Sequence, residues 1–397
     1  MTSFSLSSAP RCVFIAAALV AALAAGCGPD DGSAEYESGV AAYETRDLER
    51  AVKRFRESLD LAPDRVDAWV MLSRACLDLG DMAAAKEAVS RAAELAPGDV
   101  DVVELSAQLA YHAKDFKKAM SLYSDLAKSQ DAAVSSRAYC ALAVVEMAAG
   151  TSGADERRDR ARTFLLAAVK LDGRNAAARY HLGLLYCNSF AYPEAALDQF
   201  GIFANLAEPS DGLQKVVDSN RLKKVKEQYI PGLRANIDRA NAQRPGADRR
   251  DSAKSAAALK AADDAWKKGR FKDARAKYAE AYSADVLNYQ AALALAEATR
   301  KVDPSNGGLA EAFKHYKAAS QLRPSSRDTL MTLGDLAMKL GRHAAAAEAY
   351  SRAVAARPYD ISAIDGLVRA LRKCGNAKSA AIYQNYRDFV SPPKGSR

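Results

Sequence analysis

The sequence lacks the residue patterns that most catalytic and metal sites require. It contains four histidines (His112, His181, His315 and His343), and none lies at metal-ligand spacing from a second His or a Glu. It has no Cys-x-x-Cys, no nucleophile motif in a supporting context and no glycine-rich phosphate loop after a strand. We therefore predict no catalytic residue, no metal ligand and no bound cofactor, and we expect a protein that is not an enzyme.

Strand-forming patterns are also scarce. Few stretches alternate β-branched or aromatic residues with polar ones, whereas Ala, Leu, Lys, Arg and Glu are abundant and favour helix. The sequence therefore predicts an all-α fold. The 57 Lys and Arg residues exceed the 49 Asp and Glu residues by a net charge of +8, with both signs dense along the chain. No basic motif with interleaved aromatic residues accompanies this excess, which argues against nucleic-acid binding.

Residues 1–26 have the form of a secretory signal rather than of folded structure. Arg11 precedes an apolar run from Val13 to Ala25 that is too short for a comfortable membrane span. The run ends Leu23-Ala24-Ala25-Gly26-Cys27, which resembles a bacterial lipoprotein box. The resemblance implies that Cys27 is lipidated and begins the mature chain, with residues 27–33 as lipidated Cys and tether. An ordinary signal peptide with an incidental Cys27 is the alternative.

The residue after the lipidated Cys bears on the expected location. In the lipoprotein resemblance an Asp there favours the inner membrane, and this chain has Gly28. The resemblance therefore implies a bacterial cell-envelope protein that is lipid-anchored in the outer membrane and faces the periplasm. More than one acyl chain would be needed for a stable membrane anchor.

Proline is scarce, and its spacing indicates a repeat. Among the 13 prolines, Pro63 and Pro97 are 34 residues apart, as are Pro324 and Pro358, and Pro358 and Pro392. The same interval separates small residues in two runs, which are Ala51, Ala85 and Ala119, and Ala312, Ala346 and Ala380. A fixed period of this length is typical of stacked supersecondary units.

One helix-turn-helix template fits the residues around these markers. Leu72 and Cys76 lie on one face of a first helix, Gly80 makes the turn, Ala85 lies on a second helix and Pro97 ends the unit. The pattern and its period resemble the tetratricopeptide repeat. The resemblance implies an α-solenoid of about nine helix pairs. Gly183, Gly334 and the alanine columns would allow close helix crossings, and aromatic side chains would fill the adjoining gaps; they are Phe55, Tyr123, Tyr278, Tyr316 and Tyr350.

The repeat is interrupted, so we predict two superhelical blocks joined by an irregular helical segment. The predicted domains are an N-terminal solenoid over 34–209, a basic helical connector over 210–254 and a C-terminal solenoid over 255–394. Pro231 and Pro245 are expected to punctuate the connector. In the fifth unit, Ala195 is expected to continue the column of packing alanines.

The connector carries more than half of the net charge. Between Ser210 and Arg250 ten Lys or Arg residues face five Asp or Glu residues. One interpretation is a solvated helix pair. The other is a basic patch for anionic lipid headgroups or envelope polymers, with the candidates Arg221, Lys223, Lys224 and Lys226.

Partner binding is expected in the concave groove that first helices line in the tetratricopeptide resemblance. The candidates are side chains of the types that supply interface energy, together with polar neighbours. They are Tyr139, Tyr180, His181, Trp266, Met331, Asp335, Met338, Arg369, Arg372 and Lys373. The Lys, Asn and Arg set with which some such domains grip a C-terminal carboxylate is missing from the first three units.

The cysteines after Cys27 are expected to be buried small hydrophobes on first helices, namely Cys76, Cys140, Cys187 and Cys374. A Cys140–Cys187 disulfide is the alternative. Taken together, the two resemblances imply a non-enzymatic, membrane-anchored scaffold or adaptor that binds protein or peptide partners in a cell-envelope assembly or secretion system. The alternative is binding of envelope polysaccharide or anionic lipid through the basic connector.

Overall fold

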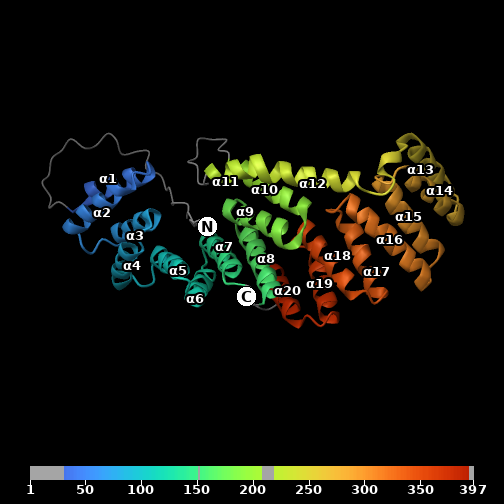
Figure 1. Cartoon of the computed structure of the whole chain (residues 1–397). Helices are drawn as coiled ribbons and strands as arrows, with labels where there is room; N and C mark the ends of the chain where they lie inside the picture. The colour runs from blue at the N-terminus through green and yellow to red at the C-terminus, as the bar shows by residue number, and fades with distance from the viewer. Residues whose placement is uncertain (1–30, 151–152, 208–218, 393–397) are drawn as a thin grey trace. The chain divides into compact units, whose positions relative to one another are not determined.

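The computed structural model of the chain describes residues 31–150, 153–207 and 219–392 (Figure 1). The predicted signal peptide and Cys27 lie outside these residues. Within them the secondary structure is helical and contains no β-strand, so the all-α prediction is confirmed. No helix in this part of the chain is both long and apolar enough to cross a membrane.

The chain divides into two compact units. Unit 1 comprises residues 1–151 and 168–175, and unit 2 comprises residues 152–167 and 176–397. Each unit contains helix pairs, from α1 and α2 through α5 and α6 in unit 1 and from α13 and α14 through α19 and α20 in unit 2, in which the two helices of a pair pack against each other. The predicted domain ranges, including the connector over 210–254, stay predictions.

Unit 1 begins with three helix pairs, each followed directly by the next. Its helices are α1 (Ser33–Glu44), α2 (Leu48–Leu61), α3 (Val66–Leu79), α4 (Met82–Leu95), α5 (Val100–His112), α6 (Phe116–Leu126) and α7 (Ala132–Ala148). The helix α8 (Ala154–Leu171) contributes residues to both units. In the three pairs an Asp caps the second helix, since Asp47, Asp81 and Asp115 each accept a hydrogen bond from the backbone N–H three residues later. Such a cap stabilises a helix by about 1 kcal/mol.

Unit 2 continues from α8 with further helix pairs. They are α9 (Ala176–Leu185) with the π-turn Tyr186–Phe190, α10 (Pro193–Ala207), α11 (Ser219–Lys224) with the π-turn Val225–Tyr229, α12 (Ile230–Ala242), α13 (Ser252–Lys267), α14 (Phe271–Ala284), α15 (Tyr289–Val302), α16 (Asn306–Leu322), α17 (Arg327–Lys339), α18 (His343–Ala356), α19 (Ile361–Lys373) and α20 (Ala377–Val390). A short 3₁₀ turn, Ala247–Arg249, precedes α13.

Close helix crossings depend on glycine facing an aromatic ring. A Cβ on Gly183 would lie 2.7 Å from the Phe200 ring, and a Cβ on Gly334 would lie 2.7 Å from the Tyr350 ring. Real Cβ atoms do not approach other atoms so closely, so each ring can pack there only because the side chain is missing. The predicted role of Gly183 and Gly334 is thereby confirmed. The predicted aromatic fillers, including Phe55 and Tyr123, are also buried.

The expected position of the packing alanine in the fifth pair is wrong by one residue. Ala196 is fully buried, as Ala85 and Ala346 are, whereas Ala195 is only half-buried. The cause is the π-turn at the end of α9, because a π-turn accommodates one more residue than an α-helical turn. The extra residue shifts the phase of α10 relative to the 34-residue period.

The π-turn Val225–Tyr229 and the helix α12, which precede α13, pack against the rest of unit 2. The π-turn after α11 and the helix α12 contact α10, and the Tyr229 ring stacks on Phe200 with 5.2 Å between centroids. Pro231, expected to punctuate this segment, lies in the first turn of α12 directly after the π-turn. The helical path continues through this point, since Tyr229 and Ile230 are helical and the Ile230 N–H still donates to the Val225 carbonyl oxygen.

The cysteines do not all follow the prediction. Cys76 and Cys140 are buried, as expected. Cys187 is half-buried and lies in the π-turn after α9, and Cys374 is exposed at the C-terminal cap of α19. Cys187 carries a free thiol, so the alternative Cys140–Cys187 disulfide is not formed in this structure.

Candidate functional site

A hollow of about 330 Å³ lies on the first-helix side of the C-terminal pairs. It brings together three of the predicted partner-binding residues, Asp335 and Met338 from α17 and Arg369 from α19. Arg300 of α15 and Lys339 of α17 also line it, and they were not among the predicted candidates. The hollow therefore spans three successive first helices, where the repeat places equivalent side chains next to one another.

Tyr350 of α18 closes the base of this hollow. Its hydroxyl donates a hydrogen bond of 2.6 Å to Asp335 Oδ1, and its ring is fully buried against Gly334. Burial, together with the Asp335 carboxylate, raises the pKa of Tyr350 above its usual range, while Arg369 opposes that shift. The phenol therefore stays neutral and holds one Asp335 oxygen. The cations Arg300, Lys339 and Arg369 outnumber this single carboxylate around the hollow.

The remaining predicted groove residues have varied surroundings. Arg372 and Lys373 are exposed on the last turn of α19. Met331 and Tyr139 are half-buried, and burial raises the pKa of Tyr139. Trp266 is half-buried and packs edge-on against Phe271, with 4.8 Å between ring centroids. Trp266 therefore contributes to packing within its own pair.

Tyr180 and His181 do not face a groove, which corrects their predicted role. Their exposed fractions are 8% and 1%. Tyr180 packs against Phe203 of α10, with 5.3 Å between ring centroids. Burial, together with the nearby Arg221 guanidinium, lowers the pKa of His181 to about 3. Both residues serve the core of the fifth pair.

The predicted basic patch is partly used in packing. The Arg221 guanidinium lies 5.4 Å from the centre of the Tyr180 ring, and the Lys224 ammonium lies 5.3 Å from that of Tyr229. Lys223 and Lys226 are exposed. Two of the four cations therefore contact aromatic rings of the protein itself.

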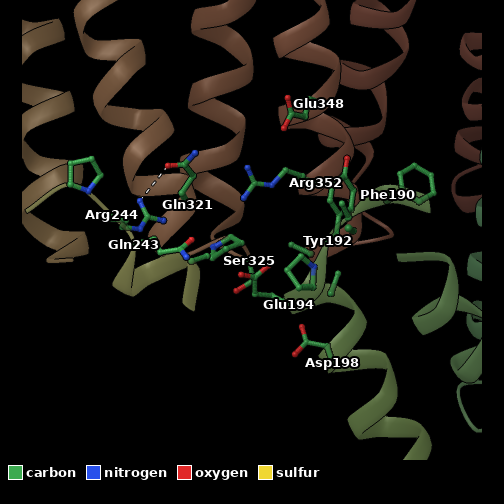
Figure 2. Close-up of a pocket in the computed structure, with 18 residues that line it drawn as sticks. Phe190, Tyr192, Glu194, Asp198, Gln243, Arg244, Gln321, Ser325, Glu348 and Arg352 are labelled. Atoms are coloured by element: carbon green, nitrogen blue, oxygen red, sulfur yellow. Dashed lines mark hydrogen bonds between the residues drawn. The ribbon is translucent and has the colours of Figure 1, made fainter. Parts of the chain in front are cut away.

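A larger cavity of about 570 Å³ lies elsewhere in unit 2 (Figure 2). Its walls come from the start of α10, the end of α12, the turn between α16 and α17, and α18. Figure 2 shows Arg352 near the middle, Arg244 and Gln321 on one side, and Phe190 and Tyr192 on the other. The size is within the usual range for ligand pockets. No sequence motif pointed to this cavity, because its walls lie far apart along the chain.

The arginines of this cavity form hydrogen bonds with the protein, whereas two of its carboxylates, Glu194 and Asp198, have raised pKa values. Arg244 donates to Gln321 Oε1 at 3.3 Å, and Arg352 donates to the Ser320 carbonyl oxygen at 2.8 Å. Burial raises the pKa of Glu194, an effect that Arg352 opposes, and burial also raises the pKa of Asp198. None of the described lining residues is His or Cys. The arrangement can bind polar groups but offers neither a thiol nor an imidazole for catalysis.

A buried cluster around Arg162 lies next to this cavity. The Arg162 guanidinium, from α8, donates to Ser351 of α18 and to the Tyr383 hydroxyl of α20. Tyr383 in turn donates to Asp159 at 3.0 Å, and Tyr192 donates to Ser351 Oγ at 3.2 Å. We call these five residues the Arg162 cluster. They join α8 to the last helices of the chain, which lie beside it in Figure 1.

The described residues contain no group of three or more His, Cys, Asp or Glu side chains placed to hold a metal ion.

Two sequence models of the tetratricopeptide repeat match the chain. One covers residues 42–109, and the other covers 16–66, 259–300 and 305–361. The fold is a tetratricopeptide-like α-solenoid. The predicted fold class is confirmed by these matches and by the helix pairs that occupy the matched segments within the described residues.

No curated protein matches the chain. Similar solved structures include one from the functional characterization of Pseudomonas aeruginosa pilF, with 14% identity over 54% of this chain and 93% of that chain and a TM-score of 0.40. The Cut9–Hcn1 hetero-tetramer of APC/C has 14% identity over 90% and 79%, with a TM-score of 0.34. YrrB, a tetratricopeptide-repeat protein with an unusual peptide-binding site, has 16% identity over 47% and 91%, with a TM-score of 0.32. At these identities the likenesses concern the fold alone.

Proposed function

We propose that this protein is a non-enzymatic scaffold that holds a protein or peptide partner on the first-helix side of its C-terminal pairs. The observation that carries the proposal is the hollow in which Asp335, Met338 and Arg369 meet. Tetratricopeptide repeats generally bind other proteins rather than catalyse reactions, and stacked pairs present continuous surfaces for this purpose.

The test is capture of partners by site-specific crosslinking. A photo-crosslinking residue at Met338 should trap discrete proteins from an envelope extract. The same residue placed at Lys317, which is exposed on the second helix α16, is the matched control. Equal capture at both positions, or no capture at Met338, would exclude the hollow as the binding surface.

We further propose that the chain is anchored by lipid at Cys27 and faces the periplasm from the outer membrane of a bacterial cell envelope, where it serves an assembly or secretion system. The support is the resemblance of residues 23–27 to a lipoprotein box. Cys27→Ser should move the protein from the membrane fraction to the soluble fraction, and metabolic labelling with a fatty acid should disappear. Retention of the label in the variant would exclude Cys27 as the acylation site.

Binding of envelope polysaccharide or anionic lipid through the basic segment is the alternative proposal. Lys223, Lys224 and Lys226 support it because their side chains are exposed, although the Lys224 ammonium also lies over the Tyr229 ring. Charge reversal at Lys223 and Lys226 should reduce the binding of vesicles that contain phosphatidylglycerol. An affinity that is unchanged and independent of salt would eliminate this alternative.

A further inference from the structure

Charged side chains of both signs line the cavity of about 570 Å³ in unit 2 without pairing with one another. Glu194, Asp198 and Glu348 supply three carboxylates, and Arg244 and Arg352 supply two guanidinium groups. No ion pair joins any two of these side chains in the described part of unit 2. Opposite charges attract more strongly at a partly desolvated site than in bulk water. The protein itself leaves this attraction unused.

Glu194 is the carboxylate of this set that is least accessible to water. It lies in the first turn of α10 and is half-buried, whereas Asp198 and Glu348 are exposed. Its own backbone N–H favours the charged form, and its carboxylate forms no ion pair in the described part of unit 2. Burial raises the pKa of Glu194, and the Arg352 charge opposes that shift. The carboxylate is thus partly removed from water without gaining a cationic partner.

Arg352 of α18 has spare donors in the same cavity. The side chain is half-buried, and one of its terminal nitrogens donates to the Ser320 carbonyl oxygen at 2.8 Å. A guanidinium has several further N–H donors in a fixed planar arrangement, which suits a carboxylate. In the view of Figure 2, Arg352 lies between Glu348 and Glu194. A cation from α18 and an anion from α10 therefore face one cavity.

The wall that leads into α10 has an unusual backbone. The π-turn Tyr186–Phe190 is followed by Ala191, whose φ of 52° lies in the left-handed region. Residues other than glycine adopt this region at a cost, and such residues cluster at sites that bind ligands. Phe190, Ala191 and Tyr192 all line the cavity, so this segment is part of its wall.

The cavity suits a small organic molecule better than a metal ion. Three carboxylates line it, yet no three His, Cys, Asp or Glu side chains of the described residues are placed to hold a metal ion. The volume is within the usual range for pockets that bind small molecules. Pro193, Ala195 and Ala355 also line the cavity and offer apolar contact beside the charges.

We propose that this cavity binds a free α-amino acid, with the ligand carboxylate at Arg352 and the ligand ammonium at Glu194. The two charged groups of an α-amino acid are attached to one carbon atom, so one small molecule can contact both side chains. Charge-assisted hydrogen bonds would then form on both sides of the ligand. The cavity shares no lining residue with the hollow beside Tyr350, so the inference goes beyond the scaffold function and does not rest on it.

The binding test uses the purified full chain and the proteinogenic L-amino acids, added one at a time. A ligand that binds only the folded state raises the melting temperature, so thermal melting identifies the binders. Isothermal titration calorimetry then compares the best binder with its amide, which lacks the carboxylate charge, and with its N-acetyl form, which lacks the ammonium charge. Both derivatives should bind about tenfold more weakly or worse, because each loses one charge-assisted contact.

Two substitutions test the assigned contacts. Glu194→Gln and Arg352→Gln should each weaken binding by about tenfold or more. Glu227→Gln and Arg234→Gln make the same chemical changes at exposed residues that do not line the cavity, and both should bind as the native protein does. Circular dichroism establishes that the variants are folded, which matters for Arg352→Gln because it loses the donor to Ser320.

Ala195→Leu tests the cavity without removing a charge. This residue is half-buried and lines the cavity, so a larger side chain there should reduce the space and weaken binding. The variant keeps the proposal testable if Arg352→Gln does not fold. Native affinity in Ala195→Leu would contradict a ligand position between α10 and α18.

Three further outcomes would overturn the proposal. The first is a melting temperature that no amino acid changes at about 10 mM. The second is an amide or N-acetyl derivative that binds as tightly as its parent, because one of the two charges would then be unused. The third is equal loss of affinity in Glu194→Gln and Glu227→Gln, which would place the ligand elsewhere on the chain.

Discussion

Arg162 donates two hydrogen bonds to Ser351, one to its Oγ and one to its carbonyl oxygen, both at 2.7 Å, although the two residues are 189 positions apart. The guanidinium is fully buried and also lies 4.9 Å from the centre of the Phe190 ring. A buried cation is tolerated only where donors and charge are compensated. The Arg162 cluster supplies acceptors for both terminal nitrogens of the guanidinium and thereby joins α8 to α18 and α20.

Arg162→Ala should therefore destabilise unit 2 by about 3 kcal/mol or more, because it leaves a cavity and removes the donors that Ser351 and Tyr383 contact. Tyr383→Phe removes one hydroxyl and should cost about 1–2 kcal/mol, since Asp159 then loses a donor. Urea unfolding monitored by circular dichroism gives both values. A cost below about 1 kcal/mol for Arg162→Ala would show that the cluster contributes little to stability.

The packing register in α10 gives a second prediction. Ala196→Leu should overpack the crossing of α9 and α10 and cost about 1–3 kcal/mol, whereas Ala195→Leu should change stability by less than about 0.5 kcal/mol. Ala346→Leu, at the equivalent buried position of α18, should behave like Ala196→Leu. Thermal melting compares the three. A larger cost at Ala195 than at Ala196 would contradict the one-residue shift.

The one-residue shift in α10 is a packing detail that the repeat period of the sequence does not predict. Proline and alanine intervals predict the helix pairs, because each pair repeats the same close helix crossing. The packing role of Gly183 and Gly334 is predicted for the same reason, since a close crossing needs a small residue. The π-turn after α9 has no such signature, so Ala195 was predicted where Ala196 packs. The Arg162 cluster and the cavity around Arg352 unite residues from distant pairs, and a periodic pattern carries no information about such contacts.

Thiol accessibility gives a third prediction. Cys374 is exposed, whereas Cys76 has an exposed fraction of 1% and burial raises the pKa of its thiol. Since thiolate is the reactive form, Cys374 should react first with a maleimide in the folded protein, and Cys76 should react only on unfolding. Mass spectrometry of peptides after timed labelling identifies the modified cysteine. Labelling of Cys76 at the rate of Cys374 would mean that the crossing of α3 and α4 is open.

The fourth prediction concerns acid sensitivity through His181. Burial lowers the pKa of this imidazole from 6.5 to about 3, with Arg221 as a further cause. Below pH 6.5 the unfolded chain therefore binds a proton that the folded chain does not, so stability falls as the pH falls from about 6.5 toward 3. At pH 5 the loss should be about 2 kcal/mol, from 1.36 kcal/mol per pH unit.

His181→Gln removes this titration and isolates the effect. The variant should lose less stability than the native protein between pH 7 and pH 5, even though its absolute stability at pH 7 is lower. His112 and His315 also have lowered pKa values through burial, but they are present in both proteins and cancel in the comparison. Urea unfolding at a series of pH values measures the difference. Parallel curves for the two proteins would show that the folded protein can protonate His181, which would contradict its burial beside Tyr180.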